Sequence, residues 1–223
     1  MHHSAIKKYC KPPQFWFIST FKSIVHLNFY GVFLTDKIKV LAFAGSLRVG
    51  SYNKALVRAA VEVAPPTMAI ETYDLEGIPL YNADLDDNLP PKVVEFKQKI
   101  RDADALLIAT PEYNYSLSGV LKNALDWASR PPQGHPLEGK PVAIMSASGG
   151  KFGGARAQYH LRQIFVFLDM HPINRPEVML SEAQNNIDEK GNLTNPQTRQ
   201  LITQLLESLT TWTLRLQTKS PQQ

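Results

Sequence analysis

A repeated order of apolar run, loop and helical pattern constrains this chain more than any other feature. The runs at residues 105–109 and 141–146 are almost wholly apolar, as are strands that are buried on both faces of a parallel sheet. Each is followed by a loop and then by a helical pattern, which is the order of βαβ units. Such units predict an α/β fold with one parallel sheet and helices on both faces. The predicted strands are 38–44, 68–74, 105–109, 141–146 and 177–180, and the predicted helices are 55–63, 91–103, 119–127, 154–168 and 196–216.

The loop between the first predicted strand and its helix, residues 45–53, has the composition of a phosphate site. A helix N-terminus presents unpaired backbone N–H groups and the positive end of the helix dipole. Arg48 adds a planar fork of donors suited to phosphate oxygens. The alternative is an ordinary capped helix, with Ser51 or Asn53 as the N-cap. The candidate phosphate residues are Gly45, Ser46, Arg48, Ser51, Tyr52 and Asn53.

A second loop, residues 111–116, follows the buried run 105–109 and is rich in flat rings and backbone amides. These groups suit a planar heterocyclic ligand. In a doubly wound sheet, ligands bind at the carboxyl ends of the strands, where the strand order reverses between the first and third strands. We therefore expect the phosphate loop and this ring loop to face each other. The candidate ring-binding residues here are Pro111, Glu112, Tyr113, Asn114 and Tyr115, whereas Trp127 is expected to be packing.

A third stretch, residues 146–163, completes a set of motifs that resembles the NADPH-dependent FMN reductase family, most of all its plant NADPH:quinone oxidoreductases and bacterial quinone and chromate reductases. The resemblance runs from about Lys37 to Leu216. Ser118 stands where the family often has proline, and Lys151 stands where small residues are common. Ser118 can cap the following helix instead. Lys151 either approaches the dinucleotide phosphate or points into water.

This resemblance implies a flavodoxin-like, doubly wound, five-stranded parallel sheet that binds FMN and uses NADPH or NADH as co-substrate. The flavin carries the redox chemistry, so no side chain is expected to be catalytic. The resemblance further implies a homodimer or homotetramer, with the active site near a subunit boundary. The backbone amides of the Gly149-Gly150 turn and of the loop from Glu112 to Asn114 are expected to stabilise negative charge on the reduced ring. The cofactor-binding residues expected in the third stretch are Ser146, Gly149, Gly150, Phe152 and Gly153.

The expected reaction is transfer of hydride from NADPH or NADH to FMN, followed by two-electron reduction of a quinone or similar acceptor. Azo, nitro, chromate or free-FMN reduction would differ only in the acceptor. The alternative of another class is a flavodoxin-like carrier of single electrons. Flavodoxins are usually strongly acidic, whereas residues 37–223 hold 20 basic and 19 acidic residues once the four lysines and one aspartate of residues 1–36 are set aside. This near-neutral body also gives no indication of nucleic-acid binding.

Residues 1–36 precede the resemblance and are expected to be an extension outside the reductase domain, 37–223. Their apolar runs are interrupted by Lys22 and His26, so no stretch reaches the ~20 residues that span a bilayer. They resemble a transit peptide in being poor in acidic residues, but they also lack arginine. The other interpretation is that translation was assigned to start too far upstream, so that these residues are an extension that does not pack on the reductase domain. The single cysteine, Cys10, suits a reducing compartment, and we expect a cytoplasmic protein, or an organellar one if the extension is a transit peptide.

Other motifs fail on their details. Gly134–Lys140 matches a nucleotide-binding loop, but Pro141 replaces the Ser or Thr that binds magnesium. A calcium-like series from Asp84 to Glu95 contains Pro90-Pro91 and lacks the required glycine. His160 and His171 have no second ligand at metal spacing, so surface or capping roles are favoured and no metal site is predicted.

Overall fold

The computed structural model describes residues 37–131 and 134–218. The chain divides into two units, residues 1–34 and 35–223, and all the elements described below belong to the second. The prediction for residues 1–36 lies outside the described residues.

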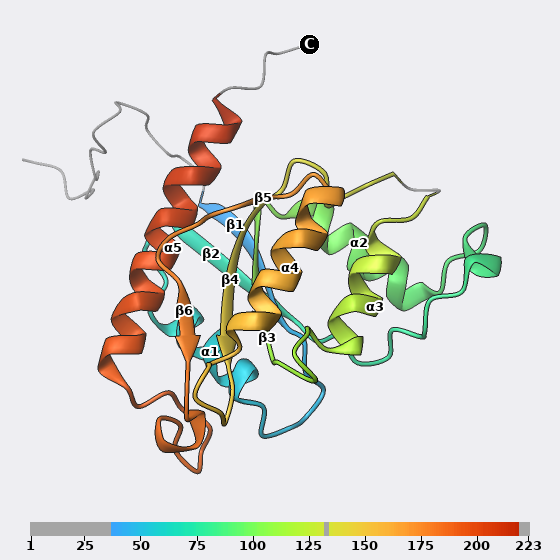
Figure 1. Ribbon diagram of the computed structural model, residues 1–223. Coiled ribbons are helices and arrows are strands. Elements are labelled where there is room, and N and C mark those ends of the chain that lie inside the picture. The colour runs from blue at the N-terminus through green and yellow to red at the C-terminus, as the bar shows by residue number, and fades with distance from the viewer. Residues whose placement is uncertain (1–36, 132–133, 219–223) are drawn as a thin grey trace, which may run out of the picture. The chain divides into compact units, whose positions relative to one another are not determined.

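One parallel sheet forms the centre of this unit (Figure 1). Its strands are β1 (Ile38–Ala44), β2 (Met68–Tyr73), β3 (Ala105–Thr110), β4 (Pro141–Ala147), β5 (His171–Pro172) and β6 (Val178–Leu180). The order is β2-β1-β3-β4-β5, and β6 also pairs with β4. The chain therefore reverses its direction of growth between β1 and β3, which confirms the predicted flavodoxin-like order.

The fifth position of the sheet differs from the single predicted strand at 177–180. Two short strands share it, since β5 pairs with the start of β4 and β6 pairs with its end. Pro172 and Pro176 lie in or between them, and a proline has no N–H to donate to a strand ladder. The prolines explain why this edge of the sheet is not one continuous strand.

The helices agree closely with the predicted ranges. They are α1 (Tyr52–Glu62), α2 (Pro91–Asp102), α3 (Gly119–Ala128), α4 (Ala155–Phe167) and α5 (Pro196–Gln217), with short 3₁₀ turns at Ala83–Leu85 and Ala183–Asn185. Ser51, Ser118 and Asn195 are the N-caps of α1, α3 and α5, and each side chain accepts an N–H three residues ahead. Ser118 thus replaces the proline of the family as expected. None of the helices in the described ranges is long and apolar enough to cross a membrane.

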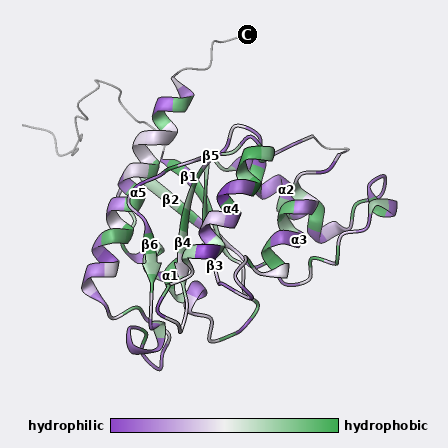
Figure 2. Ribbon diagram, in the orientation of Figure 1, coloured by the Kyte–Doolittle hydropathy of each residue, from purple (hydrophilic) through white to green (hydrophobic). Residues whose placement is uncertain are grey.

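The helices cover both faces of the sheet (Figures 1 and 2). α1 and α5 pack on one face, against side chains such as Val40 and Leu107. α2, α3 and α4 pack on the other face, against side chains such as Leu41 and Ile108. Because β1, β3 and β4 are buried on both sides, each fully buried Leu or Ile adds about 1.5–3 kcal/mol to the driving force for folding.

Because the strands are parallel, the carboxyl ends of all of them lie on the same side of the molecule, which is the lower side in Figure 1. The loops after β1, β3 and β4 therefore come together at the carboxyl ends of the strands. These are the three loops that the sequence analysis selected.

Candidate active site

The first loop is tied to the second through the start of α3. Gly45 N donates to Ala109 O at 2.8 Å, and Ser118 Oγ donates to Gly45 O at 2.6 Å. A Cβ atom on Gly45 would lie 2.9 Å from the Leu121 Cβ atom, so only glycine allows β1 to approach α3 this closely. The phosphate loop thus begins at a fixed position beside the ring loop.

Several donors of the first loop have no partner among the described residues. The backbone N–H groups of residues 46–50 donate to no other described group. Ser46 is 4% exposed, and its hydroxyl forms no hydrogen bond within the described ranges. The Arg48 guanidinium lies 4.8 Å from the centroid of the Tyr52 ring and forms no ion pair with a described carboxylate. This is a donor set suited to a phosphate monoester.

Two predicted phosphate residues also have structural roles. Ser51 is the N-cap of α1, and its Oγ accepts from Lys54 N at 3.4 Å. Asn53 bonds to β4 in both directions, since Nδ2 donates to Ala147 O and Oδ1 accepts from Ala147 N, each at 3.0 Å. The Asn53 side chain therefore fixes α1 against the end of β4, and the group that it offers to a phosphate is its backbone N–H.

The second loop is a tight hairpin turn. Tyr113 N donates to Ser116 O at 2.9 Å and Ser116 N donates to Tyr113 O at 3.0 Å. Asn114 and Tyr115 between them have φ angles of 50° and 67°, in the left-handed region that a two-residue turn of this type requires. Both tyrosines are exposed, which leaves their rings available to a ligand. Trp127 is instead buried in α3, with Nε1 donating to Pro79 O at 2.8 Å, so its predicted packing role is confirmed.

Glu112 turns its side chain toward α4. Its Oε2 accepts from Arg156 N at 3.1 Å, and Oε1 is ion-paired with Arg156 Nε. The guanidinium also lies over two rings, 3.7 Å from the centroid of Tyr115 and 4.7 Å from that of Phe152. Sequence reasoning did not select Arg156, although it lies in the third family stretch and a basic residue in the first turn of a helix is unfavourable without a partner.

The third loop rests on buried polar contacts. Ser146 Oγ donates to Gly153 O at 2.6 Å, and the buried Gln158 Nε2 donates to Ser146 Oγ at 2.8 Å. Ser146 therefore fixes the third loop through a buried hydrogen bond to its backbone. The backbone N–H groups of Gly149 and Gly150 have no partner among the described residues, and the Phe152 ring is exposed.

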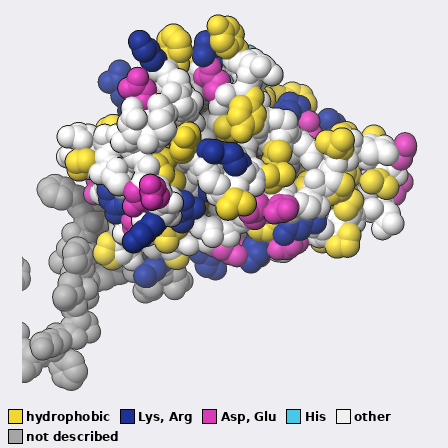
Figure 3. Space-filling model, turned by 90° about the horizontal axis from the view of Figure 1, so that it is seen from below, with side chains coloured by type: hydrophobic (Ala, Val, Ile, Leu, Met, Phe, Trp, Pro, Cys, Tyr) yellow, Lys and Arg dark blue, Asp and Glu magenta, His cyan; other side chains and the backbone are white. Residues whose placement is uncertain are grey.

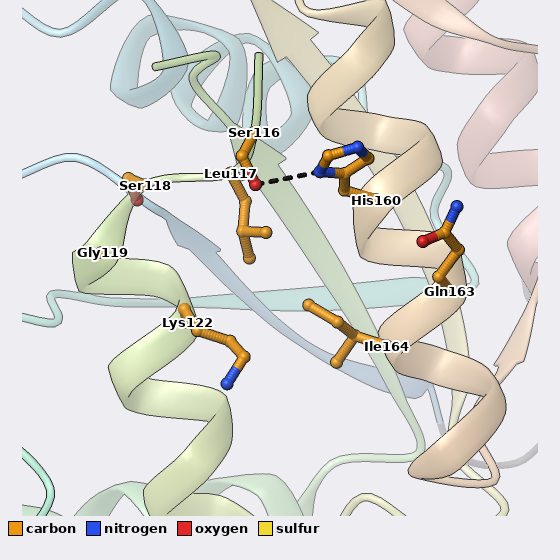
Figure 4. Close-up of a pocket in the computed structure, with 8 residues that line it drawn as sticks. All are labelled: Ser116, Leu117, Ser118, Gly119, Lys122, His160, Gln163 and Ile164. Carbon is orange, nitrogen blue, oxygen red and sulfur yellow. Dashed lines mark hydrogen bonds between the residues drawn. The ribbon is translucent and has the colours of Figure 1, made fainter. Parts of the chain in front are cut away.

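A hollow of about 530 Å³ lies beside the ring loop, between the start of α3 and α4 (Figure 4). His160 Nδ1 is 3.0 Å from Ser116 Oγ at its rim, so this exposed histidine contacts the ring loop. Lys122, which also lines the hollow, forms an ion pair with Asp126 at 2.7 Å. The hollow contains none of the phosphate-loop residues, so it adjoins the three-loop site without being part of it.

The face that carries the strand ends is seen in Figure 3, where basic side chains lie among hydrophobic ones near its middle. Unpartnered N–H donors of the first loop, exposed rings and unpartnered glycine amides thus lie together at the carboxyl ends of the strands. These groups fit FMN, which has one phosphate and one flat ring system.

Comparison with known proteins gives the same assignment. The family described as NADPH-dependent FMN reductase matches residues 38–185. An NAD(P)H-dependent FMN reductase of Pseudomonas aeruginosa is 58% identical over 184 residues, covering 82% of this chain and 99% of that protein. An NADPH:quinone oxidoreductase of Arabidopsis thaliana is 50% identical over 189 residues, covering 82% of this chain and 95% of that protein.

A solved structure of similar fold supports the same relationship. FerB, a flavoenzyme NAD(P)H:(acceptor) oxidoreductase from Paracoccus denitrificans, superposes with a TM-score of 0.73 at 30% identity, covering 79% of this chain and 97% of that chain. The fold, the three loops and these similarities lead to one conclusion. The chain belongs to the NADPH-dependent FMN reductase family.

Proposed function

We propose that this protein is an FMN-dependent NAD(P)H:quinone oxidoreductase. The proposal rests on one observation. Loops that follow three parallel strands bring unpartnered N–H donors together at the carboxyl ends of these strands, in a chain of the FMN reductase family. When bound, FMN supplies the redox chemistry, since it can take hydride from a nicotinamide and pass two electrons to an acceptor. The protein supplies position and electrostatics.

Each loop has a separate task in this proposal. The N–H groups of residues 46–50, Ser46 Oγ, Arg48 and the N-terminus of α1 hold the phosphate. The turn from Glu112 to Tyr115 and the exposed Phe152 border the ring. The N–H groups of Gly149 and Gly150 stabilise negative charge on the ring as it is reduced, without any movement at the moment of reaction.

Quinone is the proposed acceptor because the Arabidopsis relative is named as an NADPH:quinone oxidoreductase. An exposed, ring-lined edge also admits other flat or small acceptors, so azo, nitro, chromate or free-flavin reduction is the second candidate. A flavodoxin-like carrier of single electrons is a third candidate. The close similarity to an NAD(P)H-dependent FMN reductase favours an enzyme over a carrier.

We also propose that residues 37–223 form the reductase domain and that the protein acts as a homodimer or homotetramer. Val166 and Phe167, two neighbouring apolar residues of α4, are each 82% exposed, and exposed apolar patches mark protein–protein contacts. We propose that the protein acts in the cytoplasm, because its single cysteine, Cys10, suits a reducing compartment.

Two measurements on the purified protein test the function. Chromatography of the heat-released cofactor should identify FMN, because the first loop offers donors for one compact phosphate. Steady oxidation of NADPH should then depend on added quinone, and a panel of acceptors compared by rate should rank quinones first. FAD in place of FMN, or no NADPH oxidation by the flavin-loaded protein when quinone is present, would overturn the proposal.

A further inference from the structure

We propose that Arg156 is a positioning residue that holds the ring-binding turn of the second loop against α4. This inference rests on the proposed function, because it assumes that the turn contacts a flavin ring. Arg156 acts through Glu112 and Tyr115, the two turn residues that it contacts.

The first step concerns the start of α4. Gly154 is the N-cap of this helix and has no side chain to accept a hydrogen bond from the first turn. Glu112 takes over this task from another loop, since its Oε2 accepts from Arg156 N at 3.1 Å. A carboxylate at a helix N-terminus is stabilised by the helix dipole. The second loop is thereby joined to the element that follows the third loop.

The second step concerns the burial of Glu112. Its side chain is only 7% exposed, and a buried carboxylate is costly unless it is paired and hydrogen-bonded. The Arg156 guanidinium supplies the paired charge through Nε. Removal of Arg156 would leave Glu112 buried without a counter-charge, so the loop would have to move to bring the carboxylate into water.

The third step concerns the turn itself. Tyr115 has a φ of 67°, a conformation that a bulky residue adopts only when its surroundings compensate for the strain. Tyr115 is 66% exposed, and the Arg156 guanidinium lies 3.7 Å from the centroid of its ring. A cation over an aromatic face is attractive, and Phe152 borders the same guanidinium on the third loop. Arg156 therefore fixes the ring end of the site.

The phosphate end is fixed by different contacts. The first loop is held by the Ser118 hydroxyl on Gly45 O and by the paired hydrogen bonds of Asn53 with Ala147. Arg156 takes part in none of these. Loss of Arg156 should therefore weaken binding of the ring and leave phosphate recognition unchanged, which separates its role from that of Arg48.

Binding of two ligands to stripped apoprotein tests this separation. Riboflavin has the same ring system as FMN but no phosphate. Arg156→Ala should weaken binding of FMN and of riboflavin by the same factor, about tenfold, so that the ratio of the two dissociation constants stays as in wild type. Arg156→Lys keeps the charge without the planar fork and should recover part of both affinities. Arg48→Ala should weaken FMN only.

Arg162→Ala is the matched control. Arg162 lies on the same helix, and its guanidinium bonds to Asn174 and to Ile173 O, outside the three loops. This variant should lose a comparable contact of α4 and keep both flavin affinities. Thermal denaturation of each apoprotein establishes that all titrations are made well below unfolding.

The possible results distinguish failure of the Arg156 role from failure of the proposed function. Unchanged affinities in Arg156→Ala, a loss confined to FMN, or an equal loss in Arg162→Ala would each overturn the inference while FMN-dependent activity persists. A wild-type protein that binds neither flavin would overturn the proposed function, and this inference with it. Parallel losses for both ligands, confined to the Arg156 variants, would establish the positioning role.

Discussion

Arg48 is the side chain on which phosphate recognition can be tested most directly. It is exposed, its guanidinium lies 4.8 Å from the Tyr52 ring centroid, and no described carboxylate neutralises it. A charge-assisted hydrogen bond contributes about 1.5–3 kcal/mol. In Arg48→Ala, the FMN dissociation constant should therefore rise by about one to two orders of magnitude, as measured by titration of the apoprotein.

Arg48→Lys should restore part of this loss, because a point charge cannot reproduce the planar fork. Excess FMN should restore activity in both variants, since the ring loop is unchanged. An Arg48→Ala protein with wild-type affinity would mean that Ser46 and the backbone N–H groups hold the phosphate without the arginine.

Gly154 is a residue where stability depends on the absence of a side chain. It has a φ of 88°, and a Cβ atom would lie 2.6 Å from the Ser146 Cβ atom. Gly154→Ala should lower the free energy of unfolding by about 1–3 kcal/mol, from backbone strain and overpacking. Thermal denaturation measures the loss. Gly119→Ala is the control, because a Cβ atom there meets no heavy atom within 4 Å and its stability should stay close to that of wild type.

At the scale of elements, α2 and α3 are linked by a buried lysine. Lys97 of α2 is fully buried, and its Nζ donates to Arg130 O just beyond α3. Burial, and next the charge of Arg101, lower the pKa of Lys97 below its usual 10.5. The unfolded chain therefore binds more protons than the folded chain in the pH range between the two pKa values.

This linkage predicts that Lys97 contributes more stability as pH rises from its lowered folded-state pKa to 10.5, and no further gain above that value. The difference in unfolding free energy between wild type and Lys97→Met should shift in favour of wild type by at most about 1.4 kcal/mol per pH unit in that range. Urea denaturation at several pH values measures it. A pH-independent difference would show that the lysine keeps its ordinary pKa in the folded protein.

The sequence predicted most elements because their signals are local. Apolar runs and cap residues such as Ser51 and Ser118 fixed the strands and the starts of α1 and α3. β5 was missed because a two-residue strand that contains Pro172 has no pattern of its own. Its pairing is set by β4.

The candidate site was predicted in part, for the same reason. Its loops follow from their composition and position after the strands. The contacts within it join residues far apart in sequence, such as Asn53 with Ala147 and Glu112 with Arg156, which are separated by 94 and 44 positions. No spacing rule pairs these residues, so the use of the Asn53 side chain on β4 and the role of Arg156 required the structure.

At the scale of the whole molecule, the sheet and both helical layers are built from residues 38 to 217. The family match also begins at residue 38. A protein shortened to begin at Lys37 should therefore fold, retain FMN and keep the NADPH:quinone activity of the full chain. Flavin content and steady-state rates of the two proteins, compared at equal concentration, measure this. An insoluble or flavin-free product would show that residues 1–36 are needed by the domain.

The bonds that hold the first loop, from Ser118 to Gly45 and from Asn53 to Ala147, do not involve the exposed rings of Tyr113 and Phe152. Selection can therefore replace these ring residues one at a time while the scaffold that holds the cofactor stays intact. A lineage built on this plan can change the molecules that it reduces more quickly than it changes its architecture.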